Sequence, residues 1–295
     1  MTLPVPTTQP TWGGHGQRHL RSRKGATVRP TTTPLDTAAR PAWSSLALRE
    51  VLLGAPGHGR VRWETRSACY AEVRSRGRDQ LVALLAPGAV RVPMGIVIDV
   101  RDLPGVGTDV HLGAGLIGFG ARTWRPTRWW NPRPRLDPGG LTERRGALRQ
   151  ALQAEPDTSF GLPLAEELSV GAALARGDVQ AATAVIGLGP GLTPSGDDVV
   201  AGALVMLALL SRLDGGTARA VLDRARTHTT ALSTALLEAA TQGQMIPQAA
   251  RLLEAVAAAA PQPQVDARAD ELFAVGAHSG HDLAAGMLGA LVGAP

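Results

Sequence analysis

Residues 187–210 read Gly-Leu-Gly-Pro-Gly-Leu-Thr-Pro-Ser-Gly-Asp-Asp-Val-Val-Ala-Gly-Ala-Leu-Val-Met-Leu-Ala-Leu-Leu, a glycine-dense loop that passes directly into an apolar run. Glycines let backbone N–H groups approach a ligand closely, and the N-terminus of a helix favours an anion. The segment is not a Walker loop, because it has no lysine, and Pro190 interrupts any dinucleotide fingerprint. It predicts a ligand-binding loop at the start of a buried helix.

A second segment repeats the pattern near the C-terminus. Residues 195–202 and 279–286 both read Ser-Gly-x-Asp-x-x-Ala-Gly, and both lead into apolar residues. The spacing predicts that Ser195 and Ser279 are helix N-caps, each with an aspartate at N3 as in a capping box. Gly202 and Gly286, two turns further on, would let the two helices pack closely and bring their N-termini together.

Capping alone explains the serines and aspartates without any ligand, and this alternative stays open for the second segment. It does not require the whole glycine set of the first segment or an additional aspartate. We therefore expect substrate or phosphate binding at the first segment, with the second as a candidate extension. The candidate binding residues are Gly187, Gly189, Gly191, Thr193, Gly196, Ser279, Gly280 and Asp282, and the candidate catalytic residues are Ser195, Asp197 and Asp198.

The carboxylates bear on the kind of ligand. Asp197, Asp198 and Asp282 close together would repel a bare phosphate. Either Mg²⁺, held by Asp197 and Asp198, bridges carboxylate and phosphate, or an aspartate accepts from the N–H group of an amide substrate. The sequence leaves both open, and no cofactor is certain. His278 and His281 are candidate acids or bases, without a third ligand at a zinc spacing.

The rest of the chain divides by pattern into a β-rich part and a helical part. Short apolar runs separated by Gly and Pro, without intervening helices, predict a barrel or sandwich-like domain over residues 41–137. Ala- and Leu-rich segments at helical spacing predict an all-helical domain over residues 138–295. The expected fold class is α+β. The main strand runs are Arg60–Val73, Gln80–Leu85, Gly95–Val100 and Asp109–Phe119.

Two segments are rich in arginine. Residues 1–40 are dominated by Pro, Thr, Gly and Arg and are predicted to be a disordered basic tail. Residues 124–135 interleave tryptophan with arginine and proline; base stacking is one interpretation, but we expect a linker that packs its indoles on the next domain.

Charge and composition exclude several classes of function. The chain has 295 residues and a net charge of +5, and this excess lies entirely in residues 1–40, which argues against nucleic-acid binding by the folded part. Residues 41–150 carry +8 and residues 151–295 carry −8, which suggests a cleft of mixed sign. Lys24 is the only lysine and Cys69 the only cysteine, which excludes Schiff-base chemistry in the body and an internal disulfide.

The sequence also gives an expectation for location. The longest apolar run, Val199–Leu210, has twelve residues, whereas a spanning helix needs about 20. The first residues have no apolar signal core. We expect a cytoplasmic protein without a membrane partner.

At residues 187–198, with the helix that follows, the sequence resembles the AllH family, whose named member is one component of a three-component oxamate carbamoyltransferase. Residues 229–243 also resemble this family, and the resemblance extends over about residues 45–293. It implies carbamoyl transfer between carbamoyl phosphate and oxamate, or the reverse phosphorolysis of oxalurate, in allantoin breakdown in purine catabolism. It also implies other carbamoyltransferase subunits as partners.

The resemblance suggests roles for individual residues. Gly189, Gly191 and Gly196 would offer backbone contacts, Thr193 and Ser195 hydrogen bonds, and the two aspartates would hold Mg²⁺ or the carbamoyl amine. Arginines of the β-rich domain would bind the substrate carboxylate. The alternative is a non-catalytic metabolite-binding or scaffold module of a multi-subunit complex.

Overall fold

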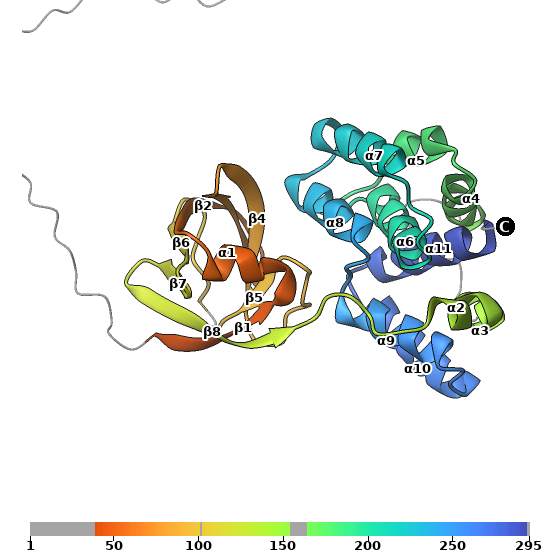
Figure 1. The fold of residues 1–295 in the computed structure, drawn as a ribbon, viewed down its shortest axis with the longest axis horizontal. Coiled ribbons are helices and arrows are strands. Elements are labelled where there is room, and N and C mark those ends of the chain that lie inside the picture. The colour runs from red at the N-terminus through yellow and green to blue at the C-terminus, as the bar shows by residue number, and fades with distance from the viewer. Residues whose placement is uncertain (1–38, 101, 154–163, 294–295) are drawn as a thin grey trace, which may run out of the picture. The chain divides into compact units, whose positions relative to one another are not determined.

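Eight strands of the N-terminal part close into a barrel (Figure 1) in the computed structural model, which describes residues 39–100, 102–153 and 164–293. All of these belong to one compact unit. The strand order is β1-β5-β4-β3-β2-β6-β7-β8. The strands are β1 (Arg40–Ser45), β2 (Gly57–Glu64), β3 (Ala68–Ser75), β4 (Arg78–Leu85), β5 (Gly95–Val97), β6 (Asp109–Gly113), β7 (Leu116–Phe119) and β8 (Arg122–Trp130).

Tight turns set the register of the barrel. Arg76 and Gly77, with φ of +52° and +75°, join β3 to β4 in a two-residue turn, and Ser75 pairs with Arg78. Positive φ at both central residues matches the twist of the strands. The predicted single run Arg60–Val73 is therefore the hairpin β2–β3, because residues 65–67 lie between the two strands. A short helical segment, η1 (Leu46–Leu48) and α1 (Arg49–Leu53), follows β1.

The prediction of a linker at residues 124–135 is wrong for its first half. Residues 124–130 belong to β8, which pairs in parallel with β1 and antiparallel with β7. Trp124 is fully buried in the barrel, stacks on Phe119 with ring centroids 4.5 Å apart, and donates from Nε1 to Asp99 Oδ1 at 2.8 Å. Its indole therefore stabilises the barrel itself.

The rest of the described chain is helical, so the predicted α+β fold class is confirmed. The predicted tail falls outside the described residues except for its last two. The helices are α2 (Pro138–Glu143), α3 (Arg145–Gln153), α4 (Leu164–Ala175), α5 (Val179–Val185), α6 (Ser195–Leu209), α7 (Gly215–His228), α8 (Ala231–Thr241), α9 (Pro247–Ala257), α10 (Gln262–Phe273) and α11 (Ser279–Gly293).

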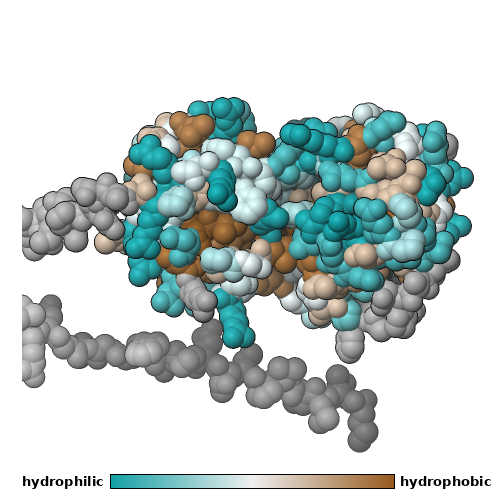
Figure 2. Space-filling model, turned by 90° about the horizontal axis from the view of Figure 1, so that it is seen from below, coloured by the Kyte–Doolittle hydropathy of each residue, from teal (hydrophilic) through white to brown (hydrophobic). Residues whose placement is uncertain are grey.

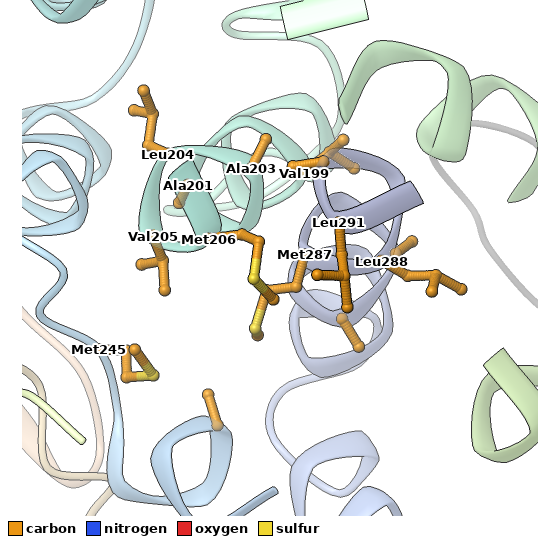
Figure 3. Close-up of a cluster of buried hydrophobic side chains, with 14 of the residues drawn as sticks. Val199, Ala201, Ala203, Leu204, Val205, Met206, Met245, Met287, Leu288 and Leu291 are labelled. Carbon is orange, nitrogen blue, oxygen red and sulfur yellow. The ribbon is translucent and has the colours of Figure 1, made fainter. Parts of the chain in front are cut away.

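The two apolar helices α6 and α11 form the centre of the helical core. They lie side by side, and Figure 3 shows Met206 of α6 and Met287 of α11 reaching toward each other. Both methionine side chains are fully buried. Gly202 and Gly286 allow this approach, because a side chain at either position would collide with the backbone of the other helix. The close packing predicted from the repeated glycine is confirmed.

Helix α8 connects the helical core to the barrel. Leu232 is buried within the hydrophobic core of the barrel, and Leu236, one turn later, packs against the same core. Further along, Met245 N donates to Pro132 O at 2.9 Å, and Arg135 N donates to Glu254 Oε1 at 2.8 Å. Apolar contact and backbone hydrogen bonds therefore hold α8 and the segment after it against the β-rich part of the chain.

Candidate functional site

The glycine-dense loop before α6 has a backbone that only glycine adopts easily. Gly187, Gly189 and Gly191 have φ of +83°, +115° and +97°. The Leu192 carbonyl oxygen accepts hydrogen bonds from Thr230 Oγ1 at 2.6 Å and, more weakly, from Ser233 Oγ at 3.3 Å. The loop is therefore fixed against the N-terminus of α8.

Asp197 holds this loop in place. Its Oδ1 accepts from Gly187 N at 2.8 Å, and its Oδ2 accepts from Thr229 Oγ1. The residue is 2% exposed. Both oxygens of this carboxylate are thus engaged with the protein, at the junction of the loop and the end of α7.

Gly196 and Gly280 serve equivalent packing positions in the two repeats. A Cβ at Gly196 would lie 1.9 Å from the Val185 carbonyl oxygen, and one at Gly280 would lie 1.9 Å from that of Leu272. Each glycine lets its helix start directly against the end of the preceding one, α5 or α10. The backbone of these two glycines is therefore packed against the protein.

The prediction that Ser195 is an N-cap is wrong. Helix α6 begins at Ser195, its N-cap is Pro194, and no side chain caps it. Helix α11 likewise begins at Ser279, and Asp282 N donates to His278 O at 3.0 Å. Each serine lies inside the first turn, where its hydroxyl is available to another element.

The two helix starts exchange serine and aspartate contacts. The Ser279 hydroxyl hydrogen-bonds the carboxyl group of Asp198, and the Ser195 hydroxyl faces that of Asp282. Thr193 Oγ1 lies 3.1 Å from Ser279 Oγ and also hydrogen-bonds Asp198. The structure thus brings together the N-termini of the two repeats, as their spacing predicts.

Burial controls the charge of these carboxyl groups. It raises the pKa of Asp198 to about 8; the hydroxyls of Ser279 and Thr193 oppose this, while the charges of Asp282 and Asp197 add to it. Asp198 is therefore mostly protonated at neutral pH. Its Oδ2 is buried and has no hydrogen-bond partner among the described residues.

The pKa of Asp282 is also raised. Burial raises its pKa, while Ser195, Glu167 and the charges of His278 and His281 lower it. The ring of His281 stacks on that of Phe273 with centroids 3.9 Å apart. The two histidines thus lie near Asp282, where they reduce the cost of its charge.

A cavity of about 260 Å³ opens beside Asp198. The polar side chains that line it are Thr193, Asp198, Ser279, Gln244 and Tyr70 of β3. None of the described residues that line it is arginine or lysine, so the expected mixed-sign cleft is not found at this cavity. The apolar lining residues are Val90, Val92, Pro93, Leu192, Ala201, Val205, Leu232, Leu236, Ala240, Met245, Ile246, Val275 and Leu283.

The side chains that could serve as metal ligands test the predicted Mg²⁺ site. The described residues contain no group of three or more His, Cys, Asp or Glu side chains arranged to hold a metal ion. Asp197 contacts Gly187 and Thr229, whereas the neighbouring Asp198 contacts Ser279 and Thr193. The two consecutive carboxylates thus have different surroundings.

Sequence reasoning missed part of the site. The lining residues Tyr70, Val90, Val92 and Pro93 come from the β-rich part of the chain, and Glu167 comes from α4. Glu167 carried a signal, since it is an acidic residue within the apolar segment Leu164–Leu174, and it is 1% exposed. The wall residues carried none, because they are ordinary apolar residues of a β domain.

Comparison with known proteins supports the resemblance found in the sequence. Residues 185–291 match the model of the family AllH, described as oxamate carbamoyltransferase subunit AllH. The match extends from the last residue of α5 into α11, so it includes both Ser-Gly-x-Asp repeats and excludes the barrel. No curated protein and no solved structure matches the chain. Within the described part of the chain, no helix has the length and apolar character to cross a membrane.

Proposed function

We propose that this chain is a subunit of an oxamate carbamoyltransferase-like enzyme and that Asp198 lies at the reacting end of its cavity. One observation supports the proposal: Asp198, Thr193 and Ser279, all within the residues of the family match, lie together in the lining of a cavity. The reaction would transfer a carbamoyl group between carbamoyl phosphate and oxamate, or run in reverse on oxalurate, within allantoin breakdown.

The environment of Asp198 supports an amide ligand over a bridging metal ion. Its buried Oδ2 faces no protein donor among the described residues, so an N–H group of the substrate would satisfy it. Protonated Asp198 would instead donate to a carbonyl oxygen. The hydroxyls of Thr193 and Ser279 supply further donors and acceptors at the same place. Uncharged carbamoyl and amide groups match this set.

The proposed step balances without a covalent enzyme intermediate. The amide nitrogen of the acceptor attacks the carbamoyl carbon, a C–N bond forms, and the C–O bond to phosphate breaks. The proton leaving the nitrogen passes to the Asp198 carboxylate, and phosphate departs with the bonding electrons. A base with a pKa of about 8 operates near physiological pH. Orientation of the reacting groups by the N-termini of α6 and α11 would supply the rest of the rate enhancement.

Other subunits complete this proposal. Carbamoyl phosphate and oxamate are anions, and the cavity lining, as far as the structure describes it, offers no arginine or lysine. We assign the binding of their phosphate and carboxylate ends to partner chains. Leu188 and Leu192 of the loop are 49% and 40% exposed, and Figure 2 shows other hydrophobic residues reaching the surface among hydrophilic ones. Such residues suit contact with another protein.

The decisive experiment measures phosphate release from carbamoyl phosphate and oxamate by this chain mixed with its partner subunits. We expect Asp198→Asn to lower the rate by about 100-fold or more, with activity of the parent chain rising through about pH 8. Asp223→Asn, which removes an exposed carboxylate on α7, is the matched control and should leave the rate unchanged. Equal rates for Asp198→Asn and the parent chain would contradict the assignment.

The second candidate is a metabolite-binding or scaffold module without turnover. The described residues that line the cavity include no arginine or lysine. This favours the second candidate if no partner subunit supplies positive charge. It predicts that ligands raise the melting temperature of the chain, while no phosphate is released with any partner present.

A further inference from the structure

The lining of the cavity beside Asp198 is more apolar than carbamoyl phosphate or oxamate requires. The cavity volume of about 260 Å³ lies just below the range of about 300–1,000 Å³ that is typical of small-molecule pockets. A carbamoyl group has three non-hydrogen atoms. Most of the remaining space faces aliphatic side chains from α6, α8 and the segment between β4 and β5.

Three polar side chains meet at one place in the cavity lining, and Tyr70 and Gln244 are the other polar side chains that line it. Thr193, Asp198 and Ser279 contact one another, whereas Val205, Leu232 and Leu236 offer only hydrocarbon. Asp198 is 8% exposed, and its Oδ2, unpartnered among the described residues, adds a buried polar atom that a ligand would satisfy. A ligand that fits both sides has a polar head and an apolar tail.

An anionic ligand group in the apolar part of the cavity is disfavoured. Asp198 lies in its wall, Asp282 is close enough to influence Asp198, and the described lining residues include no arginine or lysine. A buried carboxylate or phosphate in the apolar part would have no arginine or lysine partner among the described lining residues, which disfavours its burial. An aliphatic tail would instead replace water on the same surfaces.

We propose that the cavity takes a primary amide or carbamoyl compound with an aliphatic tail, its head at Asp198, Thr193 and Ser279 and its tail against Val205, Leu232 and Leu236. The amide head rests on the proposed function, whereas the tail rests on the cavity lining alone. The site would then also accept aliphatic amides or ureides that are larger and less polar than oxamate.

The test measures dissociation constants of the full chain for acetamide, propionamide, butyramide and isovaleramide, with oxamate and butyrate as comparisons. We expect affinity to rise roughly fourfold for each added methylene, the value that follows from burial of a CH₂ group. Butyrate should bind at least tenfold more weakly than butyramide. A flat series, or oxamate binding more tightly than butyramide, would overturn the proposal.

Two variants locate the binding. Val90→Phe narrows the apolar side at a half-buried position on a connecting segment, so it should weaken isovaleramide more than acetamide. Val90→Ile is its conservative control and should retain most of the affinity. Ser279→Ala should weaken all four amides by a similar factor, because it alters the head alone. An unchanged series in both Val90→Phe and Ser279→Ala would place the binding elsewhere and overturn the proposal.

Failure of this inference and failure of the proposed function are distinguishable. If affinity rises with chain length but no amide accepts a carbamoyl group in the reconstituted assembly, the apolar subsite stands and the transfer proposal fails. If oxamate is carbamoylated and longer amides bind more weakly, the transfer proposal stands and the apolar subsite fails.

Discussion

Gly202 and Gly286 are each pressed against the backbone of the other's helix. A Cβ at Gly202 would lie 2.0 Å from the Leu283 carbonyl oxygen, and one at Gly286 would lie 1.9 Å from that of Val199. Leu283 lies three residues before Gly286, and Val199 lies three residues before Gly202. The two repeats therefore pack with the same contact made twice, and this contact fixes the distance between the two helix starts that carry Asp198 and Asp282.

The first prediction concerns this crossing. Gly202→Ala and Gly286→Ala should each lower the free energy of unfolding by at least about 2 kcal/mol, because a methyl group has no space against a carbonyl oxygen. Denaturant unfolding measures the change. Gly146→Ala, in helix α3, is the matched control: the added methyl group would have no neighbour within 4 Å among the described residues, so the change should be neutral or stabilising. A loss at Gly146 equal to that at Gly202 would contradict the packing argument.

The second prediction concerns the pH dependence of stability. An aspartate with a pKa of about 8 in the folded chain and an ordinary pKa of 3.8 when unfolded binds more protons in the folded state between these values. Stability is therefore lost as pH rises through this window. Between pH 5 and 8 the parent chain should lose about 3–4 kcal/mol more than Asp198→Asn, whose side chain does not ionise. Parallel pH profiles for the two proteins would be the contrary result.

The third prediction separates the neighbouring carboxylates. Asp197→Ala removes the acceptors of Gly187 N and the Thr229 hydroxyl, so it should destabilise the fold by about 2–3 kcal/mol. Asp197→Asn retains one acceptor and should destabilise it less. At a temperature where both variants are folded, they should still bind butyramide, whereas Asp198→Asn should bind it more weakly. Loss of binding in folded Asp197→Asn would instead place that residue in the ligand site.

The fourth prediction concerns the barrel. Trp124→Phe keeps a stacked ring on Phe119 but leaves Asp99 without its donor, and should cost about 1–2 kcal/mol. Trp124→Ala also loses the buried ring and should cost about 3–5 kcal/mol. Thermal unfolding gives the order. Equal losses for the two variants would mean that the hydrogen bond, and not the ring, provides the stability.

Local signals in the sequence were enough for the helical part. The repeated Ser-Gly-x-Asp-x-x-Ala-Gly predicted both the crossing at Gly202 and the meeting of the helix starts, because glycine and helical spacing act over short distances. The same local view gave Ser195 the wrong role, since Pro194 is the N-cap. It also failed to separate Asp197 from Asp198. Successive residues of a helix point about 100° apart, so these two side chains contact different partners.

Long-range features were less accessible. Residues 124–130 carry arginine and proline, which are uncommon in a strand interior, and only pairing with β1 and β7 shows that they complete the barrel. The cavity brings together Tyr70, Val92, Leu236 and Asp198, which are distant in sequence. No periodicity in a single segment encodes such a meeting, so the sequence predicted the polar head of the site without its apolar side.

The cavity walls differ in how much change each can accept over evolutionary time. On the helical side, Gly196, Gly202 and Gly286 leave no space for any other side chain, so the positions of Asp198 and Ser279 depend on this close packing. On the barrel side, Val90 and Val92 are half-buried on a connecting segment that can vary in size and shape. A larger or smaller side chain at Val90 or Val92 can thus reshape the cavity while Asp198 and Ser279 keep their positions.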